Sequence, residues 1–102
     1  MGSALNVNGD DAAAAIAIAI GASELLLVAD VEGVMSDGMM VSSLTPAEAL
    51  ALIANGTAAG GMAAKLQAGI AAIEGGVRRV RISDIGAIED LSRGTTLRTI
   101  GD

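Results

Sequence analysis

Lys65 is the residue of this sequence whose position best suits contact with an anion. It lies one turn into a helix that we predict to begin at Gly60-Gly61. The backbone N–H groups of that turn, the positive end of the helix dipole and the ammonium group would converge on one anion site. Taken alone, the pattern also permits an ordinary solvated lysine beside the apolar stripe of Met62 and Leu66.

Carboxylates stand at the ends of two other predicted elements. Asp10 and Asp11 open an alanine-rich helix, and helix capping explains them as well as a role in chemistry does. Asp30 follows a predicted strand, with Val31 and Gly33 after it. Open parallel sheets place their ligands at the carboxyl ends of strands, so these residues are candidates for ligand contact. The alternative is a turn, in which Gly33 would supply a positive φ.

The residue types that are missing exclude several classes of function. Cys, His, Phe, Trp and Tyr do not occur in the 102 residues. Without Cys or His there is no disulfide, thiol nucleophile, imidazole base or zinc site of the usual kind. The net charge is −6, which disfavours nucleic-acid binding, and the apolar stretch 12–20 is too short to span a bilayer. We therefore expect a cytoplasmic protein that binds neither nucleic acid nor membrane.

Apolar patterning predicts helices that alternate with strands. Asp37-Gly38 is a type I′ turn signal, and Thr45-Pro46 with Glu48 is a capping box that begins a helix. The pattern predicts a three-layer α/β sandwich around a mostly parallel sheet, with helix 12–20 and strand 25–29 buried on all sides. The expected helices are 12–20, 45–54, 60–74 and 83–91, and the expected strands are 25–29, 34–36, 39–41, 77–82 and 95–100.

Three motifs in a fixed order carry a resemblance to a known family. They are Asn6-Val7-Asn8-Gly9-Asp10, then the strand from Leu25 to Val31 with Gly33, then Gly60-Gly61-Met62-Ala63-Ala64-Lys65. Together they resemble the C-terminal, ATP-binding half of the N-acetylglutamate kinases, in the amino acid kinase family. The resemblance covers nearly the whole chain, from about Leu5 onward, and implies the C-terminal half of the amino acid kinase fold.

The resemblance also implies an activity, with ATP and Mg²⁺ as cofactors. The family transfers the γ-phosphoryl group of Mg-ATP to a carboxylate, a reaction in which the protein mainly positions groups and neutralises charge. Asp10 would match the aspartate that organises the reaction centre, Lys65 the lysine that stabilises the phosphoryl group, and Asn6 the asparagine that contacts the acyl amino acid. The residues that would border the nucleotide are Asp30, Val31, Gly33, Gly60, Gly61 and Met62, and no residue is assigned to a metal.

Some of these residues have simpler explanations. A helix methionine such as Met62 is more often part of the core than an adenine contact. Arg78, Arg79 and Arg81 fit a solvated strand face or an oligomer contact better than a phosphate clamp.

Residues 1–3 resemble an added leader, and residues 4–102 would form one nucleotide-binding-type domain, a fragment of a larger kinase fold. The family's N-terminal half carries a second glycine-rich loop with its own lysine, so we expect little or no turnover by this chain alone. The surface that the missing half would cover predicts a homodimer. The alternative is an engineered or reduced-alphabet folding protein that self-associates and has no specific ligand.

Overall fold

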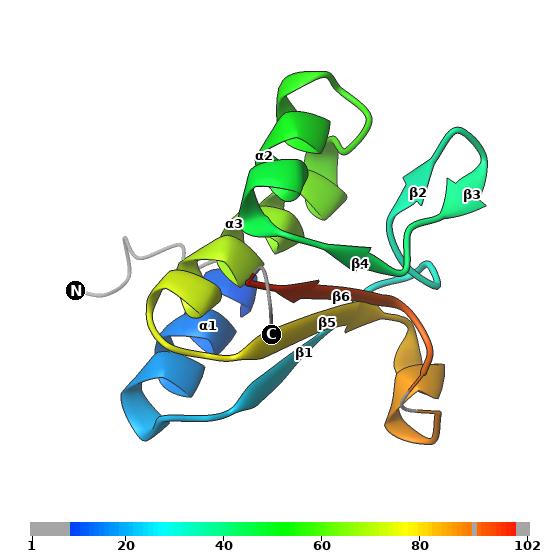
Figure 1. Ribbon diagram of the computed structural model, residues 1–102. Coiled ribbons are helices and arrows are strands. Elements are labelled where there is room, and N and C mark those ends of the chain that lie inside the picture. Colours follow the sequence, from blue (N-terminus) through cyan, green and yellow to red (C-terminus); the bar gives the residue numbers. More distant parts are fainter. Residues whose placement is uncertain (1–8, 91, 100–102) are drawn as a thin grey trace, which may run out of the picture.

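A computed structural model describes residues 9–90 and 92–99, and its centre is a four-stranded sheet (Figure 1). The strand order is β1-β5-β6-β4. β1 pairs with β5 and β4 with β6 in parallel, whereas β5 and β6 are antiparallel. The predicted α/β fold with a mostly parallel sheet is confirmed. The strands of this sheet are β1 (Glu24–Val28), β4 (Ser43–Leu44), β5 (Arg79–Ser83) and β6 (Thr95–Arg98).

Three helices pack against one face of this sheet. They are α1 (Gly9–Ile20), α2 (Pro46–Ala54) and α3 (Gly60–Glu74). α3 lies against β5 and β6 and contacts both other helices, so the three form one layer (Figure 1). The core between the layers is built from aliphatic side chains that alternate along the strands, among them Val80, Ile82 and Leu97, each 0% exposed. Of the predicted three-layer sandwich, the described residues thus contain the sheet and one helix layer. The opposite face of the sheet carries polar side chains on β5 and β6 and the apolar Leu26 and Val28 on β1.

The local signals that begin and end α2 are all present. Thr45 Oγ1 accepts the Glu48 N–H at 3.2 Å, and Glu48 Oε1 accepts the Thr45 N–H at 2.9 Å. Pro46 occupies the first turn, where its missing N–H is not needed. The helix ends before Asn55 and Gly56, and Gly56 adopts a φ of +82°. The predicted capping box is therefore confirmed.

A small hairpin follows β1, as the Asp37-Gly38 signal predicts. Its strands are β2 (Met35–Ser36) and β3 (Met39–Met40). Asp37 has a φ of +52° and Gly38 one of +77°, which are the positive values that a type I′ turn requires at both central residues. The two-residue strand β4 that follows was not predicted, because it is too short to give an alternating pattern.

Helix α1 is less buried than its composition suggests. Only Ala14 and Ala17 are buried, whereas Ile16 is 60% and Ile20 73% exposed. The prediction of burial on all sides is wrong because α1 lies at the end of the helix layer, where α3 and β1 are the described elements that contact it most. β1 is likewise an edge strand, with Val28 45% exposed, so the prediction that it is covered on both faces is also wrong.

The connection from β5 to β6 contains one short 3-10 helix, η2 (Ile85–Ile88), instead of the predicted helix 83–91. Asp84, not Ser83, accepts the capping hydrogen bond from the Gly86 N–H. Ser83 instead ends β5 as a fully buried residue. None of the helices in the described ranges is long and apolar enough to cross a membrane.

Candidate functional site

Lys65 and Asp10 form an ion pair that joins α3 to the first turn of α1. The Lys65 Nζ lies 3.0 Å from Asp10 Oδ2 and 3.2 Å from Oδ1. The two side chains are only 19% and 20% exposed, so both have lost much of their contact with water. Charged hydrogen bonds of this kind are stronger than neutral ones and hold the ammonium group at a defined position. The structure thus brings together the two residues that were predicted to be catalytic.

The N-terminus of α3 leaves its backbone donors accessible. Ala59 precedes the helix and makes no side-chain capping hydrogen bond, and the first turn contains no acidic residue. A Cβ atom at Gly60 or Gly61 would meet no atom of the described residues within 4 Å, so these residues leave space beside this turn. Gly60 also has a φ of +57°, which favours glycine. The N–H groups of this turn and the Lys65 side chain therefore belong to the same end of one helix.

Met62 has a mixed position at this helix end. It is partly buried and packs against the hydrophobic core. The core explanation for this methionine is therefore supported, and an additional contact with a ligand remains a proposal.

The segment after β1 contains the other predicted nucleotide contacts. Asp30 is exposed, and Val31 is 49% exposed. Gly33 is buried, and a Cβ atom there would lie 2.8 Å from Thr95 Oγ1 and 3.0 Å from Met40 Sδ. Its φ is not positive, so the explanation of Gly33 as a positive-φ turn residue is wrong. Glycine is needed because the chain passes close to Thr95.

Two groups of predicted residues are thus placed in different surroundings. Gly60, Gly61 and Met62 share the α3 terminus with Lys65. The atoms nearest to Gly33 belong to Thr95 and Met40, beside the hairpin, rather than to Asp10 or Lys65. Asn6, the predicted substrate contact, lies outside the described residues.

Comparison with known proteins decides the family. The sequence profile described as the amino acid kinase family matches residues 2–84, which is most of the chain. This chain belongs to the amino acid kinase family. The acetylglutamate kinase of Rubrobacter xylanophilus is 55% identical over 74 residues, and that of Roseiflexus castenholzii is 42% identical over 97 residues. These alignments cover 72% and 95% of this chain, but only 29% and 37% of the two relatives.

Solved structures show the same amino acid kinase fold. An N-acetylglutamate synthase from Neisseria gonorrhoeae, complexed with coenzyme A and N-acetyl-glutamate, superposes with a TM-score of 0.84 at 26% identity. The match covers 95% of this chain and 24% of that one. A carbamate kinase from Giardia lamblia bound to AMP-PNP superposes with a TM-score of 0.79 at 24% identity, covering 91% of this chain and 36% of its own. This amino acid kinase chain therefore spans about a third of the length of the relatives it matches.

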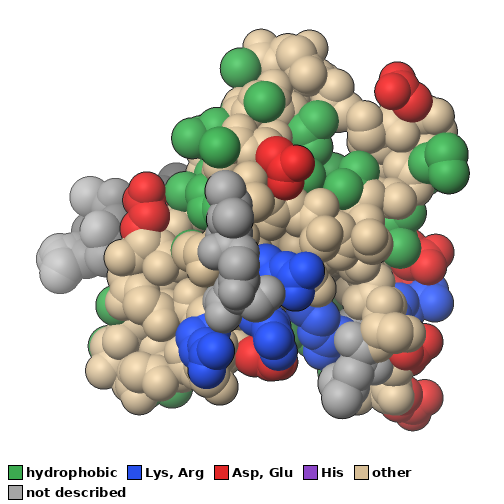
Figure 2. Space-filling model, viewed as in Figure 1, with side chains coloured by type: hydrophobic (Ala, Val, Ile, Leu, Met, Phe, Trp, Pro, Cys, Tyr) green, Lys and Arg blue, Asp and Glu red, His purple; other side chains and the backbone are tan. Residues whose placement is uncertain are grey.

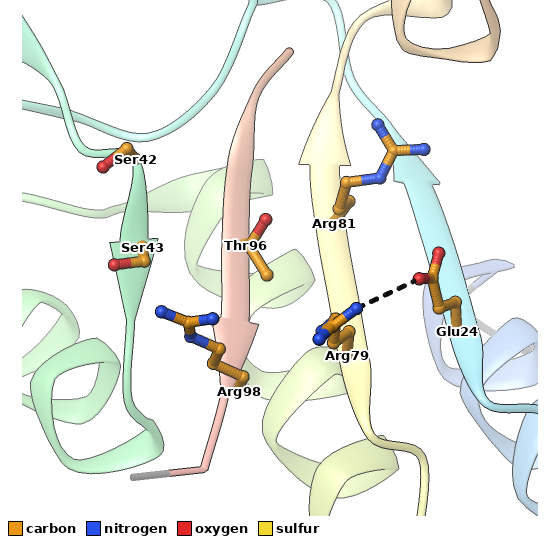
Figure 3. Close-up of a pocket in the computed structure, with 7 residues that line it drawn as sticks. All are labelled: Glu24, Ser42, Ser43, Arg79, Arg81, Thr96 and Arg98. Carbon is orange, nitrogen blue, oxygen red and sulfur yellow. Dashed lines mark ion pairs between the residues drawn. The ribbon is translucent and has the colours of Figure 1, made fainter. Parts of the chain in front are cut away.

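A hollow of this amino acid kinase chain lies away from the predicted site. It is on the polar face of the sheet, with the helices behind it, and has a volume of about 490 Å³ (Figure 3). Sequence reasoning assigned no ligand to this face. The alternation of arginine with aliphatic residues in β5 was the available signal, but it does not reveal which strand pairs with β5. The lining residues are Glu24, Ser42, Ser43, Arg79, Arg81, Thr96 and Arg98.

The clearest electrostatic perturbations also lie away from Lys65, in the β5–β6 connection. A hydrogen bond from the Arg93 guanidinium lowers the pKa of the Asp84 carboxyl below its ordinary value. A hydrogen bond from the Ser92 hydroxyl lowers the pKa of Asp90. Both carboxylates are therefore ionised at neutral pH and serve the loop structure.

Proposed function

We propose that this chain is the ATP-binding portion of an acetylglutamate-kinase-like enzyme and that it binds Mg-ATP at the N-terminus of α3. The ion pair between Lys65 and Asp10 is the observation that carries the proposal. The pair is 3.0 Å long, its two side chains are mostly buried, and Lys65 lies on the first turns of α3, whose N-terminus at Gly60-Gly61 has no side-chain cap. A cation beside free backbone donors is suited to phosphate oxygens.

Each group at this site has a distinct part in binding. The Lys65 ammonium has three N–H donors, and Asp10 occupies only part of that capacity, so a donor is left for a phosphate oxygen. The backbone N–H groups of Gly60, Gly61 and Met62 add dipoles that point toward the same oxygens. Asp10 keeps the ammonium group in place. ATP supplies the phosphoryl group to be transferred.

Mg²⁺ would bind together with the nucleotide. Among the described residues there is no cluster of three or more carboxylates that could hold a metal alone. Mg²⁺ in nucleotide sites is held mainly by phosphate oxygens and water with one or two carboxylates, so such a cluster is not required. Asp30 is exposed at the carboxyl end of β1 and is available for contact with the nucleotide or its metal-bound water.

The remaining predicted contacts belong to the nucleoside and the acceptor. Val31 is exposed and Met62 is partly buried, so aliphatic walls would face the adenine instead of aromatic ones. Gly33 would keep the backbone after β1 close to Thr95 and so set the path of Asp30 and Val31. Asn6 would contact an acyl amino acid, the class of substrate that the name acetylglutamate kinase indicates.

Phosphoryl transfer by the isolated chain is expected to be small or absent. The chain covers 29% of the Rubrobacter xylanophilus enzyme, so most of the residues that this relative uses have no counterpart here. Positioning both reactants accounts for much of the rate in phosphoryl transfer. A chain that positions only the nucleotide is therefore expected to bind Mg-ATP without efficient phosphoryl transfer.

Calorimetric titration with Mg-ATP and Mg-ADP tests this proposal. We expect saturable binding by the unsubstituted chain. Lys65→Ala should lower the affinity for nucleotide by roughly tenfold or more, because a charged hydrogen bond to phosphate is lost. Asp30→Ala should also weaken binding. Gln67→Ala is the matched control, since Gln67 is exposed on the same helix and its loss should leave affinity unchanged.

Two results would contradict the proposal. One is the absence of heat and of thermal stabilisation at millimolar nucleotide, which would favour a folding protein without a specific ligand. The other is equal weakening by Lys65→Ala and Gln67→Ala, which would place binding elsewhere. Folding of each variant is checked by far-ultraviolet circular dichroism before titration.

We also propose that the chain forms a homodimer through the exposed face of α1. Ile16 and Ile20 lie one turn apart on this helix and are 60% and 73% exposed. A self-complementary two-fold contact would cover both side chains in each copy.

A further inference from the structure

The polar face of the sheet presents its side chains in two rows across the strands. Glu24 on β1, Arg79 on β5 and Arg98 on β6 occupy the first row, because Glu24 is paired with Arg79 and Arg79 with Arg98. Arg81 and Thr96 are paired in the second row, and Ser43 on β4 is the register partner of Thr96. Figure 3 shows these side chains on the same face, with the helices behind the sheet.

The pairing of Arg79 with Arg98 is unfavourable for the protein alone. Directly opposed residues of antiparallel strands have Cβ atoms about 4.5–5.5 Å apart, and like charges at this position destabilise the sheet. One carboxylate partly offsets the repulsion. Glu24 Oε2 lies 3.8 Å from Arg79 Nη1, and this pair is long and half-exposed, so it contributes little. An excess of positive charge therefore remains on this row.

Positive charge is concentrated here although the whole chain is acidic. The net charge is −6, yet three of the six basic residues line one hollow, and Glu24 is the one acidic residue among the described residues that line it. In the space-filling view, basic side chains gather over the part of the surface where β5 and β6 lie (Figure 2). Such a local concentration against the overall charge gives this face an attraction for anions that the rest of the surface lacks.

The hollow also has the size and the donors of a small-molecule site. Its volume of about 490 Å³ lies in the range of ordinary ligand pockets, roughly 300–1,000 Å³. Three hydroxyl-bearing residues, Ser42, Ser43 and Thr96, line the hollow together with the arginines. Planar guanidinium donors match the paired oxygens of phosphate and carboxylate groups.

We propose that this face is a binding site for a small polyanion that carries phosphate or carboxylate groups, separate from the proposed ATP site. Its anionic groups would lie between Arg79 and Arg98 and neutralise their opposed charges. The site shares no residue with the α3 terminus, because it faces away from the helix layer. A second copy of the chain is a poor occupant, since a two-fold contact would bring two arginine-rich faces together.

Titration followed by amide NMR at low ionic strength tests the proposal, with pyrophosphate as the phosphate probe and tricarballylate as the carboxylate probe. We expect saturable shifts of the amides of 42–43, 79–81 and 96–98. The probe that binds more tightly identifies the chemical class of the ligand. Arg98→Gln should weaken binding roughly tenfold. Glu24→Gln should strengthen binding, because it removes the carboxylate that competes for Arg79.

Arg78→Gln is the matched control. It removes one positive charge, as Arg98→Gln does, but Arg78, which precedes Arg79 in the sequence, does not line this hollow. It should reduce affinity far less than Arg98→Gln. Thermal unfolding gives a second readout. Without anion, Arg98→Gln should raise Tm, because it relieves the repulsion between the opposed charges. Pyrophosphate should then raise the Tm of this variant less than the Tm of the unsubstituted chain.

Three outcomes would overturn the proposal. The first is equal weakening by Arg78→Gln and Arg98→Gln, which would indicate attraction by net charge alone. The second is shifts confined to residues 60–65, which would assign pyrophosphate to the ATP site only. The third is binding of an acidic peptide such as oligoglutamate with no binding of either small anion, which would make this face a protein contact.

Discussion

Arg93 meets Asp84 with two parallel hydrogen bonds: Nε donates to Oδ1 and Nη2 to Oδ2, both at 2.7 Å. The pair closes the connection between β5 and β6, because Asp84 follows β5 directly and Arg93 lies two residues before β6. Asp84 Oδ1 also accepts the Gly86 N–H at 3.0 Å. One carboxylate therefore fixes both ends of this loop.

Asp84→Asn should lower stability at neutral pH, because the amide cannot accept the paired bonds of Arg93. The folded-state pKa of Asp84 is lowered, so the unfolded chain binds more protons near pH 4. The stabilisation is thus fully present above the unfolded pKa of about 4 and is lost as pH falls through the folded pKa. Urea unfolding of both proteins from pH 7 to pH 2 should show a difference that disappears at low pH. A difference that persists at pH 2 would mean that the charge is not the cause.

Gly94→Ala should destabilise the protein strongly. A Cβ atom at Gly94 would lie 2.5 Å from Ser83 Cβ and 2.6 Å from the Ile82 carbonyl oxygen, and the φ of Gly94 is +94°. We expect a loss of about 3 kcal/mol or more in the free energy of unfolding, from backbone strain and overpacking together. Gly9→Ala is the control, because a Cβ there meets nothing within 4 Å, and it should change stability by less than about 1 kcal/mol.

Asp10→Asn should weaken Mg-ATP binding more than Asp11→Asn does. The two residues are neighbours in the first turn of α1 and carry the same charge, but Asp11 is exposed, whereas Asp10 holds Lys65. Loss of the Asp10 carboxylate frees the ammonium group to move, which we expect to reduce affinity by roughly tenfold. Calorimetry on both variants measures the difference. Equal affinities would show that the ion pair serves only to join α1 to α3.

Replacing both Ile16 and Ile20 by Gln should shift the chain from dimer to monomer. Both side chains are exposed on α1, and burial of each is worth about 1.5–3 kcal/mol in a contact. Sedimentation velocity over a range of concentrations measures the change. Because neither side chain is in the core, circular dichroism should be unaltered. If the natural sequence is a monomer at the highest concentration, the dimer proposal is wrong.

Local signals predicted the parts of the fold that depend on neighbouring residues. The Thr45 capping box and the Asp37-Gly38 turn are each determined by a few adjacent residues, and the structure contains both. The burial of α1 was not predictable in this way. Alanine and isoleucine occupy all of its sides, so no polar face indicates which side meets solvent.

The sheet order depends on distances along the chain that periodicity does not encode. Residues 84–94 connect β5 to β6. A parallel connection needs about a dozen residues or more, usually with a full helix, so this segment is at the lower limit, and with only a short 3-10 helix it joins antiparallel strands. That antiparallel pair sets Arg79 opposite Arg98. The family resemblance assigned Asp10 and Lys65 to one reaction centre, but the ion pair between these residues, which are 55 residues apart, was not predicted.

The position of β6 has a consequence for how the protein is made. The strand that comes last in sequence among the described residues lies inside the sheet, between β5 and β4, and it is the strand that β4 pairs with. During synthesis, the sheet cannot close until β6 has left the ribosome, because β6 pairs with both β4 and β5. A nascent chain stopped before Thr95 would expose the edges of β4 and β5 together, and such stalled chains should depend on chaperones to remain unaggregated.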